Sequence, residues 1–252
     1  MKKISFPILF TYSLTFALAW NAQAVQFESS EFRTPLVELY TSEGCSSCPP
    51  ADRWLSKFAK DSKLWKEYVP VAFHVDYWDY IGWKDPFAKS TYSERQRQYA
   101  REGGSTAIYT PGVRKAGVLW ETWRLPLAKP SLEDTLVGSL QFSLNGERQI
   151  FAKYERSGEL NLTDNLTLHV ALLGLGLETD VKRGENRGKR LAHDFVVLEL
   201  VSFESSKDEW QGILPATTTD APQYAVAAWV SPTNRLLPIQ ATGGFVNITP
   251  KR

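Results

Sequence analysis

The chain has 252 residues, with 29 basic and 28 acidic side chains, a formal net charge of +1 and two cysteines. This balance excludes the strongly basic footprint of proteins that bind nucleic acid or anionic membranes. Two cysteines also exclude a disulfide framework, and the length allows one large domain or two smaller ones.

The first 24 residues have the pattern of a secretory signal peptide. Lys2 and Lys3 precede a largely apolar run over residues 4–20, and Ala22-Gln23-Ala24 supplies small residues for cleavage. The run is too short and too interrupted by polar residues for a spanning helix. We therefore expect a signal peptide over residues 1–24, no membrane span after its removal, and a periplasmic or secreted protein. Disulfides persist in such compartments.

The next part of the chain alternates strand and helix patterns. In chain order the sequence predicts a strand at 36–41, a helix from 51, a strand at 69–75, a helix at 90–101, a strand around 113–119 and a helix at 131–139. This alternation predicts an α/β thioredoxin-like domain over residues 33–145.

Beyond residue 145 the pattern is strand-rich and lacks helical spacing. Apolar residues alternate or cluster over residues 148–154, 166–173, 195–203, 224–230 and 245–248, with turns between them. These short strands predict a mostly-β, β-sandwich-like domain over residues 146–250.

The two cysteines form a CxxC motif between the first strand and the first helix. The unpaired N–H groups and positive dipole of a helix N-terminus stabilise a thiolate there. The motif therefore predicts Cys45 as the exposed nucleophile that attacks a disulfide. Cys48, one turn along, is the more buried thiol that resolves the mixed disulfide.

Two residues elsewhere fit the same chemistry. Glu38 lies in the middle of a strand predicted to be buried, where a carboxylate is costly unless it has a function. We hypothesise that Glu38 takes the proton of Cys48. Pro111, after Thr110, occupies the position of a cis-proline loop that faces the CxxC motif and contacts the substrate strand.

A segment rich in aromatic and acidic residues follows the second strand. Asp76, Trp78, Asp79 and Trp83 alternate along it, which suggests a loop lining a substrate cleft, although such aromatics commonly serve packing. His74 lies inside the strand before this loop. It is a candidate for the same cleft or a hydrogen-bonded core histidine.

A second polar loop lies in the strand-rich half, at Gly184-Glu185-Asn186-Arg187-Gly188. The simplest interpretation is the tip of a hairpin. The functional alternative is a binding loop in which Glu185, Arg187 and His193 converge.

Several motifs, taken together, resemble the signatures of the DUF1223 family, secreted proteins of unknown function with a thioredoxin-like fold. The matching segments are Leu39–Asp52, Phe73–Asp79, Gly82–Pro86, Tyr109–Pro111 and Gly184–Gly188. The resemblance implies the thioredoxin-like fold and the Cys45–Cys48 pair but brings no known substrate. Gly112 follows the Thr-Pro pair, where family members often carry glutamine.

These observations predict a thiol–disulfide oxidoreductase without a cofactor, acting on protein or small-molecule thiols and disulfides. The competing hypothesis is a binding or envelope-assembly module in which the cysteines form a fixed structural disulfide. A metal site would need two ligands besides the thiolates, and the only histidines are His74, His169 and His193.

Overall fold

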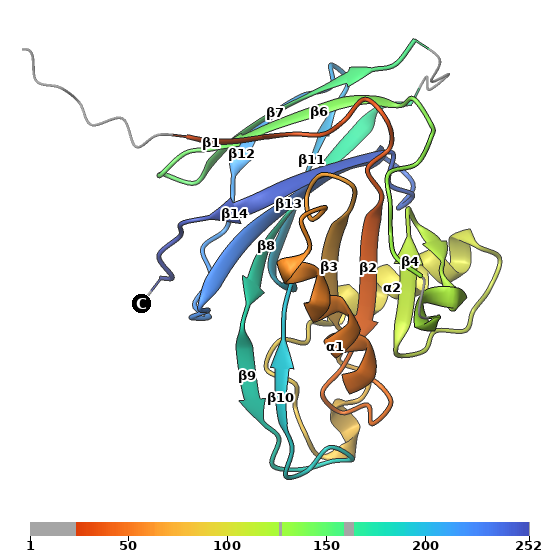
Figure 1. The fold of residues 1–252 in the computed structure, drawn as a ribbon, viewed down its shortest axis with the longest axis vertical. Coiled ribbons are helices and arrows are strands. Elements are labelled where there is room, and N and C mark those ends of the chain that lie inside the picture. The colour runs from red at the N-terminus through yellow and green to blue at the C-terminus, as the bar shows by residue number, and fades with distance from the viewer. Residues whose placement is uncertain (1–23, 126–127, 159–163, 252) are drawn as a thin grey trace, which may run out of the picture.

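The computed structural model describes residues 24–125, 128–158 and 164–251. The predicted signal peptide lies outside these residues, apart from Ala24. β-strands dominate the described part of the chain (Figure 1). Its two α-helices are α1 (Pro49–Ser56) and α2 (Ser90–Glu102), and its short 3-10 helices are η1 (Lys57–Lys60), η2 (Asp79–Ile81) and η3 (Glu121–Arg124).

An eight-stranded mixed sheet forms the centre of the molecule. Its strand order is β14-β13-β8-β11-β3-β2-β4-β5. The bounds of these strands are β2 (Leu36–Thr41), β3 (Val69–His74), β4 (Gly112–Lys115), β5 (Val118–Leu119), β8 (Leu166–Leu175), β11 (Val196–Ser205), β13 (Gln223–Pro232) and β14 (Gln240–Val246).

Two smaller sheets complete the fold. A four-stranded antiparallel sheet has the order β1-β6-β7-β12, and β9 pairs with β10 in a hairpin that extends alongside α1 (Figure 1). The bounds are β1 (Val25–Glu28), β6 (Gly138–Leu144), β7 (Gln149–Arg156), β9 (Leu177–Asp180), β10 (Arg190–His193) and β12 (Glu209–Ile213).

The long strand β8 explains how the large sheet is buried on both faces. Successive side chains of a strand point to opposite faces. Ala171 and Leu173 join the hydrophobic core that includes β2, β3 and α1, whereas Val170 and Leu172 join the core shared with the four-stranded sheet. All ten residues of β8 are therefore buried, which accounts for its nearly continuous apolar sequence.

The predicted fold class, an α/β thioredoxin-like domain followed by a β-sandwich-like domain, is wrong. The chain is mostly β, and its central sheet joins strands from both halves, since Val196 of β11 pairs in parallel with Ala72 of β3. The division into residues 33–145 and 146–250 stays a prediction, but the central sheet crosses it.

The helix expected at residues 131–139 does not form, which contributes to this error. The segment is extended, and β6 begins at Gly138 with alternating burial along the strand. Gly138 has a φ of +102°, and a Cβ at this position would lie 1.9 Å from the Glu155 carbonyl oxygen of the paired strand β7. Glycine is therefore required where β6 begins, and the period-two pattern that follows belongs to a strand.

Candidate active site

The two cysteines form a disulfide at the beginning of α1. Their Cα atoms are 5.4 Å apart, and the pair follows β2 through a tight turn in which the Cys45 N–H donates to the Ser42 carbonyl. Cys48 is the N-cap residue of α1, and prolines occupy the first positions of the helix, where a backbone N–H has no helical partner. The predicted arrangement of strand, turn, CxxC motif and helix is confirmed.

Both sulfur-bearing side chains are covered in this disulfide form. Cys45 is 1% exposed and Cys48 is 0% exposed, whereas Ser46 and Ser47 between them are exposed. The Ser47 hydroxyl lies 3.3 Å from the Cys45 sulfur. The expectation of an exposed Cys45 is therefore wrong for the oxidised protein, because a reactant meets the serines first.

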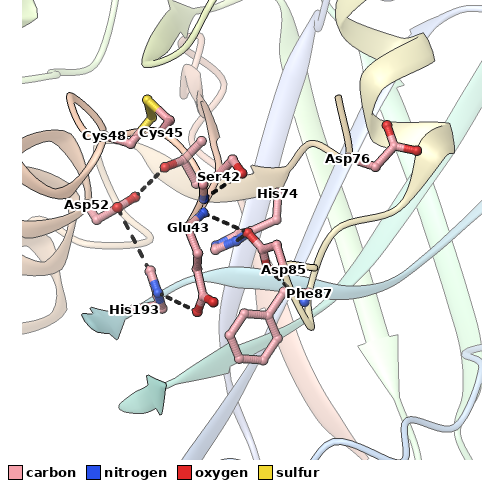
Figure 2. A network of polar contacts seen from close by, with 12 residues as sticks. Ser42, Glu43, Cys45, Cys48, Asp52, His74, Asp76, Asp85, Phe87 and His193 are labelled. Atoms are coloured by element: carbon pink, nitrogen blue, oxygen red, sulfur yellow. Dashed lines mark hydrogen bonds and ion pairs between the residues drawn. A yellow bond between two sulfur atoms is a disulfide. The ribbon is translucent and has the colours of Figure 1, made fainter. Parts of the chain in front are cut away.

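A buried carboxylate, Asp52, lies on α1 one turn after Cys48 (Figure 2). Residues four apart on a helix share a face, which places Asp52 beneath the disulfide. The Thr41 hydroxyl donates to Asp52 Oδ1 at 2.8 Å, and His193 Nδ1 lies 4.0 Å from Oδ2. Burial raises the pKa of Asp52, and the nearby His193 and His74 only partly offset this effect.

A second buried carboxylate, Glu43, connects three segments of the chain. Trp83 Nε1 donates to Glu43 Oε2 at 2.7 Å, and His193 Nε2 lies 3.2 Å from Oε1. The backbone N–H of Glu43 donates to Asp85 Oδ2 at 2.9 Å. The loop after β2, the segment rich in aromatic and acidic residues after β3 (residues 76–86, the aromatic loop) and strand β10 therefore meet at one side chain that is fully buried.

His74 and Asp85 form a buried pair next to Glu43. His74 Nδ1 lies 2.7 Å from Asp85 Oδ2. Burial lowers the pKa of His74, but the carboxylate of Asp85, with those of Asp52 and Glu43, outweighs burial and raises it overall. Burial raises the pKa of Asp85, and His74 together with hydrogen bonds outweighs that effect and lowers it.

The two histidine rings of this cluster lie against each other. Their centroids are 4.9 Å apart in an edge-to-face arrangement. His74 Nε2 and His193 Nδ1 are buried, and neither has a hydrogen-bond partner among the described residues. Of these two ring nitrogens, His193 Nδ1 faces Asp52 (Figure 2).

The β9–β10 hairpin brings the second half of the chain to the disulfide. The segment 184–188 is the hairpin tip, as its simplest interpretation predicts. Asn186 Nδ2 donates to the carbonyl oxygens of Glu43 and Cys45 at 2.8 and 3.0 Å, and Glu185 Oε2 accepts the Ser46 N–H at 3.1 Å. Glu185 and His193 thus reach the site, whereas the Arg187 side chain is exposed.

The proline loop and the aromatic loop also lie next to each other. The Thr110–Pro111 peptide bond is cis, and Trp78 Nε1 donates to the Thr110 hydroxyl at 2.7 Å. A Cβ on Gly44 would lie 2.9 Å from Trp78 Cβ, so Trp78 packs against the residue that precedes Cys45. Trp78 therefore connects the proline loop to the CxxC turn.

The two aspartates predicted on the aromatic loop have different surroundings. Asp79 Oδ1 accepts the Asp85 N–H at 3.2 Å, and desolvation raises the pKa of Asp79. Asp76 instead accepts a hydrogen bond from the Ser93 hydroxyl on α2, and Figure 2 places it away from the disulfide. Of the two, only Asp79 supports the buried network.

Glu38 lies on the other side of the sheet from the disulfide. It accepts hydrogen bonds from Arg95 Nε at 3.0 Å, Tyr40 at 2.9 Å and Tyr99 at 2.6 Å. Arg95 and Tyr99 belong to α2, which covers the face of β2 opposite to α1 (Figure 1). Glu38 is therefore the centre of a buried ion-pair cluster, and the structure does not bring it to Cys48.

Sequence reasoning missed three residues of the site: Glu43, Asp52 and Asn186. The spacing of four between Cys48 and Asp52 was the available signal, since it places both on one helix face. Within the described residues, no group of three or more histidine, cysteine, aspartate or glutamate side chains is arranged to hold a metal ion. The same part of the chain contains no helix with the length and apolarity needed to cross a membrane.

Comparison with known proteins supports a family assignment. The crystal structure of protein AGR_C_4864 from Agrobacterium tumefaciens is similar, with a TM-score of 0.62 and 22% identity, over 88% of this chain and 99% of that chain. HBP35 of Porphyromonas gingivalis has a TM-score of 0.56 and 13% identity, over 86% of this chain and 76% of that chain. At these identities the likeness shows the fold alone.

No curated protein matches the chain. The family model described as "Protein of unknown function (DUF1223)" matches residues 36–231, which include the CxxC motif, the aromatic loop, the proline loop and the β9–β10 hairpin. This match agrees with the resemblance of the separate motifs. The chain belongs to the DUF1223 family.

Proposed function

We propose that this protein is an exported thiol–disulfide oxidoreductase of the periplasm or the extracellular space, with Cys45 and Cys48 as its redox pair. The observation that carries the proposal is Asp52, a buried carboxylate one helical turn after Cys48. Burial raises its pKa, as general acid–base catalysis near neutral pH requires. A disulfide that served only as a clip would have no need of such a group.

The chemistry follows two exchange steps. In the reduced protein the Cys45 thiolate attacks a substrate disulfide, so that a Cys45–substrate disulfide forms and one substrate sulfur leaves as a thiolate. The proton of Cys48 then passes to Asp52, and the Cys48 thiolate attacks the Cys45 sulfur. This second step restores the Cys45–Cys48 disulfide and releases the other substrate sulfur. The reverse sequence oxidises a substrate dithiol.

Asp52 is suited to the proton transfer that this scheme assigns to it. The Thr41 hydroxyl fixes one carboxylate oxygen, and His193 lies beside the other. His193 is in turn positioned by Glu43, which Trp83 also contacts. The buried network therefore holds the proton acceptor in place while excluding bulk water.

A second candidate function is a binding module in which the disulfide is structural. The complete burial of Cys48 and near-complete burial of Cys45 favour it, because a working pair must be reached by another sulfur. The hydrogen bond from Asn186 to the Cys45 carbonyl adds to the cover. The two candidates differ in whether the reduced pair exchanges with an external disulfide.

Single-cysteine variants test the proposal. We expect the Cys48→Ser variant to form a stable mixed disulfide with an aromatic disulfide reagent through Cys45, because the resolving thiol is missing. The Cys45→Ser variant should form at least about tenfold less, since the proposed attack begins at Cys45 and Cys48 is fully buried. Intact-mass spectrometry after a timed reaction measures both, with Ser46→Ala as the control that keeps both cysteines. Equal trapping by the two variants, or none by either, would contradict the roles assigned here.

A further inference from the structure

The carboxylate of Glu185 lies against the CxxC motif itself. Its Oε2 atom accepts the backbone N–H of Ser46 at 3.1 Å, across 139 residues of sequence. Ser46 directly follows Cys45, and Glu185 is exposed at the tip of the β9–β10 hairpin. A negative charge from the distal half of the chain is thus placed one residue from the proposed nucleophile.

The hairpin tip is held in this position by buried contacts. Asn186 is 0% exposed and donates to the carbonyl oxygens of Glu43 and Cys45. Lys189 Nζ donates to the Asn186 side-chain oxygen at 2.9 Å. A Cβ on Gly184, which has a φ of +72°, would lie 3.2 Å from the Ile81 side chain, so the turn also packs on the aromatic loop. The placement of Glu185 is therefore a built feature of the fold.

This placement opposes the usual stabilisation of a thiolate at a helix N-terminus. The positive end of the α1 dipole favours a negative charge on Cys45, which lies just before the helix. Ser46 precedes α1, and Glu185 occupies its N–H, the backbone donor next to Cys45, and so places a negative charge beside that residue. The hydrogen bonds with Ser46 lower the pKa of Glu185, so this carboxylate is charged at neutral pH. The other acidic groups near the motif, Glu43 and Asp52, lie beneath it and are buried.

We propose that Glu185 is a positioning residue that suppresses the thiolate form of Cys45 and thereby shifts the Cys45–Cys48 couple toward its disulfide form. This inference rests on the proposed function, because Glu185 would control the redox equilibrium of the same Cys45–Cys48 pair. A less stable thiolate makes the reduced form less stable, and a couple with a less stable reduced form is more reducing. The β9–β10 hairpin would thus set the redox poise of a cysteine pair that lies in the other half of the chain.

The thiol pKa of Cys45 tests this inference directly. In a Cys48→Ala background, the pH dependence of alkylation by iodoacetamide reports Cys45 alone. We expect Glu185→Ala to lower that pKa by about one unit, with several-fold faster alkylation at neutral pH. Glu185→Gln keeps an acceptor for the Ser46 N–H but removes the charge, so its shift isolates the electrostatic contribution and should be smaller.

Glu178→Gln is the matched control. It removes the same charge from the same hairpin, but Glu178 pairs with Arg190 on β10 rather than with the CxxC motif. The inference is overturned if the Glu185 variants alkylate like the control, or if their Cys45 pKa rises. Because alkylation needs only a free thiol, the readout is independent of disulfide exchange. A protein that fails the exchange test but shows the shift would refute the proposed function and leave the role of Glu185 standing.

Discussion

An Asp52→Asn variant is expected to resolve its mixed disulfide about a hundredfold more slowly than the wild type, because general acid–base groups contribute about that factor or more. Asparagine keeps an oxygen that can accept the Thr41 hydroxyl hydrogen bond but cannot take the Cys48 proton. The first exchange step, the attack by Cys45, should change much less. Rapid-mixing measurements of the two steps separate these effects.

The same substitution should change the pH dependence of stability. The pKa of Asp52 is raised in the folded state above its value in the unfolded chain. Its contribution to stability is therefore fully present below the unfolded-state pKa of about 3.9 and is lost as the pH rises through the folded-state pKa. An asparagine side chain does not titrate, so the variant should gain free energy of unfolding relative to the wild type as the pH rises from about 4 to 7.

Urea unfolding at these two pH values measures the gain, and Asp76→Asn is the control because Asp76 bonds Ser93 outside the network. The assignment of Asp52 would be contradicted by an unchanged resolution rate. A stability difference that does not vary with pH would contradict its raised pKa.

An Arg95→Met variant is expected to lose about 3–5 kcal/mol of unfolding free energy, the cost of leaving a buried charge without its partner. The Arg95 Nε–Glu38 Oε2 contact is 3.0 Å, with side chains that are 6% and 0% exposed. The hydroxyl groups of Tyr40 and Tyr99 would still donate to Glu38 but carry no positive charge. Chemical denaturation at neutral pH measures the loss.

The double variant Glu38→Gln/Arg95→Met separates the charge from the packing. Removing both charges should recover part of the loss, because the uncompensated carboxylate is gone. The Cys45–Cys48 reduction potential should stay unchanged in both variants, since the cluster faces α2 and not α1. A loss below about 1 kcal/mol for Arg95→Met would contradict the buried ion pair. A shifted potential would contradict the placement of Glu38 outside the redox site.

Local patterns predicted much of the secondary structure. The strand expected at residues 36–41 matches β2, and the helix expected at residues 90–101 matches α2 to within one residue. The strands expected in the second half match β7, β8, β11 and β13 to within a few residues. These elements carry strong periodic or β-branched sequences, so their local preference and final structure agree.

The arrangement of these elements could not be predicted in the same way. The continuity of the central sheet depends on the pairing of Val196 with Ala72, which are far apart in the sequence. A buried strand such as β8 has the same apolar sequence whether its neighbours lie in its own half of the chain or in the other. Local pattern alone therefore favoured two separate domains.

The sequence predicts the part of the site whose residues are close together in the chain. It does not predict the part that forms through contacts between distant segments. The CxxC motif is visible because its two cysteines are adjacent to a strand and a helix. Glu43 has the sequence appearance of a turn residue and Asn186 that of a hairpin-tip residue, because the contacts that define them cross 143 and 141 residues. Glu38 was misassigned because its partner, Arg95, compensates its burial from a different element.

The reduction potential of the Cys45–Cys48 couple tests the central claim most directly. Equilibration with glutathione buffers and quantification of the two forms by thiol trapping give the value. We predict a potential between about −120 and −270 mV, the range of working thiol–disulfide catalysts. A potential below about −300 mV, which is typical of structural disulfides, or a pair that glutathione does not reduce, would contradict it and favour the binding module.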